Sequence, residues 1–171
     1  GKDRRIYVST RDLIFAEGDR FFPIVVRGYP RALGLSPNRK MLAFLEPAEF
    51  EMAANLYVFD VPARTVRRVT HLEDPATTLS VKTAKWYDSN TLYYLIGYRY
   101  GTVSRGGDLW RAELKTLGTE PIVEVVGPSK GAREIVEFEF VPRQQLIRYL
   151  VAQYDPYGDE KREAHYCTLE G

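Results

Sequence analysis

The sequence predicts an all-β protein: a β-propeller or propeller segment with about three to four antiparallel blades of four strands each. Short apolar stretches of strand length are separated by turn residues along the whole chain, and no segment shows sustained helical periodicity. A pattern of four strands also recurs at intervals of about 43 to 53 residues. Recurrence of a four-stranded unit at this spacing is typical of propeller blades.

The best-defined unit covers residues 31–70. Ser36-Pro37-Asn38-Arg39 predicts a tight turn after its first strand, because Pro presets φ and Asn tolerates the left-handed conformation. Pro62-Ala63-Arg64 predicts a second tight turn before the last strand. The four expected strands are residues 32–35, 41–45, 56–59 and 65–70. Strands joined in this way form one small antiparallel meander.

Pieces of this unit return on both sides of it. Asn55-Leu56-Tyr57 reappears 53 residues later as Asp108-Leu109-Trp110 and 43 residues earlier as Asp12-Leu13-Ile14. Residues 138–150 also overlay residues 33–45 without a gap. We therefore expect residues 1–171 to form a single propeller-type domain. Its expected parts are a partial blade 4–26, a blade 31–70, a blade 81–126 and a partial blade 134–169.

The two terminal groups are each expected to hold three strands instead of four. They either complete one shared blade and close a small ring, or they belong to a larger propeller. An open sheet leaves an edge strand with unpaired backbone groups, and this predicts self-association through that edge. Because the chain begins with Gly rather than Met, we expect it to be a processed or shortened form of a longer chain.

The first turn of the best-defined unit carries a family resemblance. Residues 36–44, Ser-Pro-Asn-Arg-Lys-Met-Leu-Ala-Phe, resemble the Ser-Pro-Asp-Gly-Lys-x-Leu-Ala-Phe turn of TolB-like (WD-type) propeller repeats. Residues 55–70 are similar to the third and fourth strands of the same repeats. Two departures stand out, since Asn38-Arg39 replaces Asp-Gly and Ala63-Arg64 replaces Thr-Gly.

The resemblance implies a non-catalytic protein-interaction or sensory module in an extracytoplasmic compartment, the periplasm or cell envelope. Similar repeats also occur in the propellers of prolyl-oligopeptidase-type enzymes. The alternative is therefore an accessory propeller of a larger hydrolase, which gates or positions a catalytic domain absent from this chain. Because one fold hosts many functions, the choice between them must rest on particular residues.

The composition limits the kinds of partner. The 24 basic and 23 acidic side chains leave a net charge of +1, so no overall field recruits nucleic acid. No apolar run reaches the length of a membrane span, and we expect no membrane insertion. The single cysteine, Cys167, cannot form an internal disulfide and is expected to be a structural thiol. The expected partner is another protein.

Propeller geometry predicts where such a partner binds. The short turns fall on one side of the blades and the long loops on the other, and binding residues concentrate on long loops held by a rigid scaffold. Tyr and Arg, which are enriched at protein interfaces, are frequent in these loops. The candidate binding residues are Phe50, His71, Tyr98, Arg99, Tyr100, Arg105, Tyr154 and Tyr157. The alternative is that aromatic residues common in strands simply continue into the loops.

One motif points to hydrolysis. Residues 127–131 fit the Gly-x-Ser-x-Gly nucleophile elbow around Ser129, and Asp155 or Asp159 and then His165 follow in hydrolase order. The elbow requires alternating strands and helices, which the chain lacks, and Pro128 fits poorly in the strained turn. We therefore expect no catalytic residue here and interpret His165 as an ordinary strand residue.

Two further loops suggest ligands. Residues 155–160, Asp-Pro-Tyr-Gly-Asp-Glu, lack the alternating spacing of a calcium loop and are interpreted as a solvated acidic turn. Residues 102–107 are rich in Gly, but they lead into a strand, whereas phosphate-binding loops lead into a helix. We expect no metal site and no cofactor.

Overall fold

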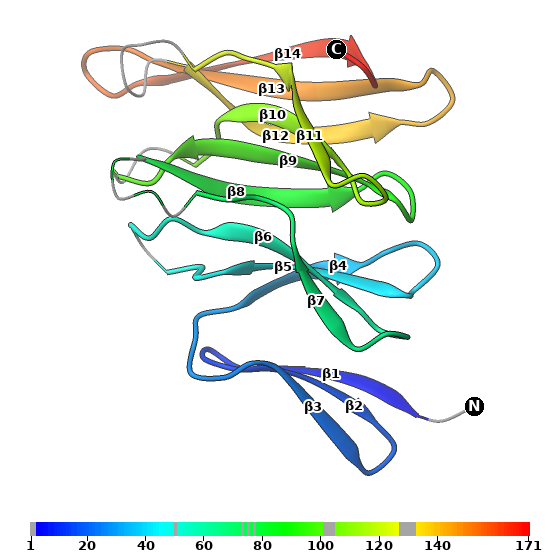
Figure 1. Ribbon diagram of the computed structural model, residues 1–171. Coiled ribbons are helices and arrows are strands. Elements are labelled where there is room, and N and C mark those ends of the chain that lie inside the picture. The colour runs from blue at the N-terminus through cyan, green and yellow to red at the C-terminus, as the bar shows by residue number, and fades with distance from the viewer. Residues whose placement is uncertain are drawn as a thin grey trace.

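The computed structural model describes residues 3–49, 51–72, 74, 76, 78–100, 105–126 and 133–171. Within these residues the regular structure is β, and fourteen strands form four antiparallel sheets that stack on one another (Figure 1). This architecture confirms the predicted all-β propeller segment. No helix in the described part of the chain is long and apolar enough to cross a membrane.

Each sheet is a meander of strands consecutive in sequence. The first sheet contains β1 (Arg4–Val8), β2 (Leu13–Glu17) and β3 (Arg20–Val25). The second contains β4 (Arg31–Leu35), β5 (Met41–Glu46), β6 (Asn55–Asp60) and β7 (Thr65–Arg68). The third contains β8 (Leu79–Trp86), β9 (Thr91–Tyr98), β10 (Asp108–Glu113) and β11 (Gly118–Val123). The fourth contains β12 (Arg133–Val141), β13 (Leu146–Tyr154) and β14 (Glu160–Thr168).

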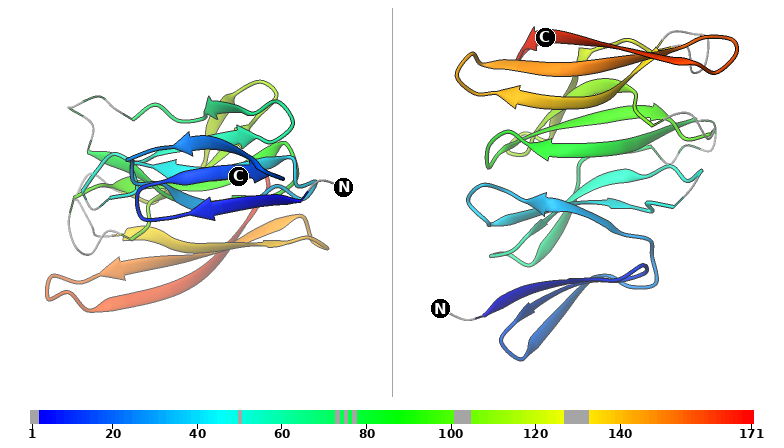
Figure 2. Two further views of the ribbon diagram at one scale, coloured as in Figure 1. Left: turned by 90° about the horizontal axis from the view of Figure 1, so that it is seen from below. Right: turned by 180° about the vertical axis from the view of Figure 1, so that it is seen from behind.

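The stack is open. The first and fourth sheets lie at its opposite ends, as Figure 1 and the right view of Figure 2 show. The terminal strands therefore do not complete one shared blade, and the expectation of a small closed ring is wrong for this arrangement. The four sheets therefore form an open segment of a propeller.

The two middle sheets are buried on both faces. In β5, Leu42 and Phe44 pack toward the first sheet, whereas Ala43 and Leu45 pack toward the third. The alternation follows from the period of two along a strand. β9 repeats this arrangement between the second and fourth sheets. Burial on both faces explains why these two strands are continuous apolar runs in the sequence.

The turn between β4 and β5 is fixed by its own side chains. Ser36 Oγ accepts a hydrogen bond from Met41 N–H, and Asn38 Oδ1 accepts one from Lys40 N–H, each at 3.0 Å. The left-handed residue is Arg39, with φ 59°. Arg39 stands where the TolB-like pattern has Gly, and Arg64, with φ 56°, does the same in the turn between β6 and β7.

In each of the first three sheets, an Asn or Asp side chain fixes the segment by which the chain leaves the sheet. Its Oδ1 atom accepts a hydrogen bond from a backbone N–H beyond the last strand of that sheet. The pairs are Asp12 with Arg27 at 3.0 Å, Asn55 with Leu72 at 2.8 Å, and Asp108 with Val125 at 2.6 Å. The repeated Asn or Asp in the sequence therefore stabilises the connection that leads from one blade to the next.

Candidate functional site

The short turns and the long connections lie on opposite sides of the stack, as predicted. The turns β4–β5, β8–β9 and β12–β13 project to one side, together with β6–β7 and β10–β11 (Figure 1). The chain that leaves β5 and β9, and the β13–β14 turn, lie on the other side. We call this second side the loop side.

The candidate binding residues within the described part of the chain lie at loop-side ends of strands or in loop-side connections. His71 follows β7, Tyr98 ends β9, and Arg105 precedes β10. Tyr154 ends β13, and Tyr157, in the turn after it, is exposed. Arg99 and Tyr100 follow directly after β9. Phe50 lies outside the described residues.

A buried carboxylate joins two of these positions. Glu134, only 3% exposed, accepts hydrogen bonds from Arg105 N–H and Tyr154 O–H, both at 3.0 Å. Burial first, and then the charge of Glu134, raise the pKa of Tyr154 to about 12. Tyr154 is therefore a hydrogen-bond donor at neutral pH. Glu134 gave no signal in the sequence, because a single Glu at the start of an inner strand reads as an exposed residue.

Lys82, from the third sheet, lies near the buried Glu134 carboxylate. Lys82 is the extra residue of a β-bulge in β8, between Val81 and Thr83. A bulge redirects a side chain away from the regular alternation of the strand. Burial lowers the pKa of Lys82, and the nearby Glu134 carboxylate opposes that shift. The Lys82 ammonium donates a hydrogen bond to the Tyr98 carbonyl oxygen.

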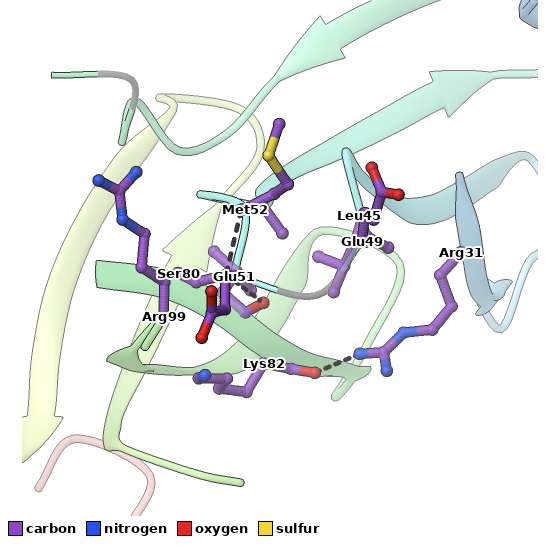
Figure 3. Close-up of a pocket in the computed structure, with 11 residues that line it drawn as sticks. Arg31, Leu45, Glu49, Glu51, Met52, Ser80, Lys82 and Arg99 are labelled. Carbon is purple, nitrogen blue, oxygen red and sulfur yellow. Dashed lines mark hydrogen bonds between the residues drawn. The ribbon is translucent and has the colours of Figure 1, made fainter. Parts of the chain in front are cut away.

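A pocket of about 150 Å³ opens beside Lys82, between the second and third sheets (Figure 3). Arg31 enters from β4 and donates a hydrogen bond to the Lys82 carbonyl oxygen. Glu49 and Glu51 contribute carboxylates from the connection after β5. The pocket therefore presents both signs of charge.

Arg99 forms another wall of this pocket. Its guanidinium carbon lies 4.6 Å from the centroid of the Tyr100 ring, a cation–π distance. Its buried Nε has no hydrogen-bond partner among the described residues. An unsatisfied buried donor is costly, and because this atom has almost no accessible surface, a bound molecule does not reach it unless the side chain moves.

The Gly-rich loop has a structural explanation. A Cβ on Gly106 would lie 1.8 Å from the Ile135 carbonyl oxygen, and one on Gly107 would lie 1.9 Å from the Ile96 carbonyl oxygen. Gly106 permits close approach of the third and fourth sheets, Gly107 permits close approach to β9 within the third sheet, and the loop leads into β10. Residues 102–104 lie outside the described part of the chain.

The other chemical motifs can be placed in part. Ser129 and the surrounding elbow lie outside the described residues. His165 is a residue of β14, and its ring stacks on that of Tyr149 at 5.6 Å. Asp155 Oδ1 accepts hydrogen bonds from two backbone N–H groups of its own turn, those of Tyr157 and Asp159. This geometry is that of a self-contained acidic turn. Burial raises the pKa of the Cys167 thiol.

The fold is similar to those of several solved structures. A protein of Clostridium novyi NT described as a conserved lipoprotein has a TM-score of 0.66 at 19% identity, over 83% of this chain and 96% of that chain. A prolyl endopeptidase has a TM-score of 0.60 at 10% identity, over 98% of this chain and 25% of that chain. TolB from Acinetobacter baumannii aligns at 16% identity over 93% of this chain and 41% of that chain, with a TM-score of only 0.47.

At these identities the likenesses establish a propeller-type fold and no more. They leave the TolB-like repeat family as a resemblance. No curated protein is detectably similar in sequence. The sequence does match the family described as a domain of unknown function, DUF4652, over residues 54–168. The match runs from the residue before β6 to the end of β14 and covers more than half of the chain. The chain therefore belongs to the DUF4652 family.

Proposed function

We propose that this chain is a non-catalytic interaction module that binds a protein partner through its loop side. The observation that carries the proposal is Arg99, which lines the pocket between the second and third sheets and whose guanidinium lies on the exposed Tyr100 ring. Arg and Tyr held in fixed positions are characteristic of interface hot spots. Lys82, Glu134 and Tyr154 hold the neighbouring surface in place through hydrogen bonds and charge.

The partner on this side presents an acceptor to Arg99 and a planar or apolar group to Tyr100. We place the interaction outside the cytoplasm, in the periplasm or cell envelope, with support from the fold likeness to the Clostridium novyi lipoprotein. The alternative of an accessory propeller rests on the likeness to a prolyl endopeptidase, of which this chain spans about a quarter. No residue described here favours that alternative over the first proposal.

Site-specific photo-crosslinking tests the proposal in cells that normally produce the protein. A photoreactive amino acid replaces Tyr100 or Tyr157 on the loop side, and Tyr87 or Tyr166, which are also exposed, in control variants. We expect discrete crosslinked products from the two loop-side positions only. Arg99→Ala should remove the Tyr100 product, whereas Arg143→Ala in the β12–β13 turn should preserve it. Equal crosslinking at all four positions, or none at Tyr100 and Tyr157, would reject the loop side as the interface.

A further inference from the structure

The first sheet has three strands, and the strand that it lacks is the one equivalent to β4 in the second sheet and β8 in the third. Leu13 and Phe15 of β2 pack toward the next sheet, as Leu56 and Val58 of β6 do. β2 therefore corresponds to β6, and β1, its neighbour, corresponds to β5. In the second sheet β4 pairs with the far edge of β5, and in the third sheet β8 pairs with β9. The equivalent edge of β1 has no strand beside it among the described residues.

The backbone of this edge is aligned for pairing. Gly18 N–H donates to the Asp3 carbonyl oxygen and Ser9 N–H to the Asp12 carbonyl oxygen, each at 2.9 Å. In an antiparallel pair, hydrogen-bonded positions alternate with positions whose backbone groups point away. The odd-numbered residues of β1 therefore bond to β2. The N–H and C=O groups of Arg4, Ile6 and Val8 point to the open edge.

A pocket of about 340 Å³ lies along the same edge, between β1 and the β4–β5 turn. Its floor is apolar and its rim is basic. The apolar residues are Ile6, Phe15, Leu35 and Val61, and the basic residues are Arg4, Arg5, Arg39 and Lys40. Arg4 pairs with Glu17 and Arg5 with Asp3, whereas the described residues supply no ion pair to the side chain of Arg39 or Lys40.

We propose that this edge binds an extended acidic segment of a partner protein, which adds to the first sheet as its fourth strand alongside β1. Strand addition satisfies the backbone groups of Arg4, Ile6 and Val8. The corresponding strand in the second sheet, β4, places Leu33 against the core, so an apolar side chain of the segment fills the pocket. Carboxylates of the segment meet Arg39 and Lys40. The site is distinct from the loop side and does not depend on the function proposed for it.

A second copy of the chain fits this site less well. The fourth sheet has two edge strands: β12 already bonds to Gly107 through Ile135, and β14 carries Lys161 and Arg162 together with Glu160 and Glu163, so its charges cancel. β1 itself carries Arg4 and Arg5. β14 and β1 would each bring cations to a rim that already holds Arg39 and Lys40. Like charges placed together oppose association. The charge of the rim therefore favours an acidic partner over self-pairing.

The probe for this site is a fluorescein-labelled decapeptide of alternating Val and Glu, with blocked ends. The matched control peptide carries N-methyl groups on alternate residues, which removes the N–H groups needed for strand pairing and keeps the charge. Fluorescence anisotropy should show saturable binding of the probe. Binding of the control peptide should be at least about tenfold weaker, and binding of the probe should weaken as the salt concentration is raised.

The protein variants separate backbone pairing from charge. Val8→Pro removes an N–H that points to the open edge and leaves the β2 hydrogen bonds intact, so the fold should tolerate it. Arg39→Asn with Lys40→Gln removes the basic rim, and Asn tolerates the left-handed φ of position 39. The matched control is Arg143→Gln with Lys161→Gln in the fourth sheet. We expect both edge variants to weaken binding about tenfold or more, with melting curves and the control variant unchanged.

Three results would overturn the proposal. The first is no saturable binding of the probe to the wild-type chain. The second is equal binding of both peptides, or binding that persists in Val8→Pro. The third is a dimer of the wild-type chain in light scattering that Val8→Pro disrupts, because the edge would then pair with a second copy.

Discussion

The two ends of the stack are attached to their neighbours in different ways. Between the third and fourth sheets, Gly107 and Ile135 exchange backbone hydrogen bonds of 3.0 and 2.9 Å. Lys85 Nζ also donates to the Phe138 carbonyl oxygen at 2.5 Å. Between β1–β3 and β4–β7, the contacts found among the described residues are those of side chains: the apolar cluster around Leu13 and the ion pair of Arg64 with Glu17.

One residue explains the difference. At the junction between the second and third sheets, Val81 N–H donates to the Ala54 carbonyl oxygen at 2.9 Å. At the junction between the third and fourth sheets, Ile135 N–H donates to the Gly107 carbonyl oxygen. By strand register, Pro30 stands at the corresponding place ahead of β4, one residue before the Arg31–Leu45 pair. Pro has no N–H to donate. The first junction therefore lacks the backbone bond that the other two form, and its stability rests on packing and charge.

The free surfaces at the two ends are alike in kind. The outer face of the first sheet carries the exposed Tyr7 and Phe21, whose rings lie 6.4 Å apart, and the Arg5–Asp3 ion pair of 2.6 Å, since Arg5 and Tyr7 share a face of β1. The outer face of the fourth sheet carries the Arg148–Glu139 ion pair of 3.1 Å and the exposed Tyr166, which lies opposite Arg148 in the strand pairing. The two ends therefore differ in how they are attached to the stack, and not in the character of their outer faces.

The largest expected effect comes from removing one aromatic ring at each junction. Phe15→Ala at the first junction and Phe138→Ala at the last should each cost about 3–5 kcal/mol, because both rings are buried. Phe15→Ala should release the first sheet while the other sheets stay folded. Phe138→Ala should lower the stability of the third and fourth sheets together. Hydrogen exchange of strand amides measures this; uniform protection loss in both variants would contradict the comparison.

A smaller effect is expected from blocking the backbone bridge. Gly106→Ala places a Cβ 1.8 Å from the Ile135 carbonyl oxygen of β12, so the third and fourth sheets must move apart beside the bridge. We expect a loss of about 2–4 kcal/mol, from strain and from unsatisfied backbone groups. The matched control is Gly118→Ala, whose Cβ would meet only the Thr116 side chain, at 3.1 Å. Chemical denaturation measures both, and equal stability of the two variants would show that the bridge is dispensable.

Much of this fold could be predicted from the sequence, because blades repeat local rules. The gapless overlay of residues 33–45 on 138–150 is matched by the pairing, since Leu35–Leu42 and Phe140–Ile147 stand at the same register. The repeated Asn55 and Asp108 also mark equivalent positions. The bulges could not be predicted: β4 is bulged at residue 33, whereas β12 is bulged at residue 136, two places further from the turn.

The candidate site was predictable only in its placement. Turn and loop lengths located the loop side, but the local environment of Glu134 depends on residues from two other strands and from the connection before β10. Its partners Arg105, Tyr154 and Lys82 are far apart in sequence, and no pattern in the chain links them. The role of Pro30 likewise appears only when the registers of three sheets are compared.

Acidification should weaken the first junction before the others. Hydrogen bonding to Arg4 first, and then to Arg64, holds the pKa of Glu17 below its ordinary value of 4.5. A lowered pKa in the folded state contributes stability above pH 4.5 that is lost as the pH falls below that value. The wild type should lose protection in β1–β3 over this range. Glu17→Gln should show a flatter pH profile; identical profiles by hydrogen exchange would contradict the assignment.

The smallest expected effect on stability comes from replacing Arg39 and Arg64, the two turn arginines with a left-handed backbone conformation. Comparing them separates the effect of backbone conformation from that of charge. Arg39→Gly relieves a residue with φ 59° and should raise the stability by about 0.5–1 kcal/mol, less the entropy that Gly adds to the unfolded chain. Arg64→Gly relieves the same strain at φ 56° but removes the ion pair to Glu17 and the cation–π contact with Phe22, 4.5 Å from the guanidinium to the ring. We therefore expect Arg64→Gly to be the less stable of the two in thermal melts, with its loss confined to the first sheet. If both variants gain equally, then Arg64 does not hold the first junction, and the apolar cluster alone does.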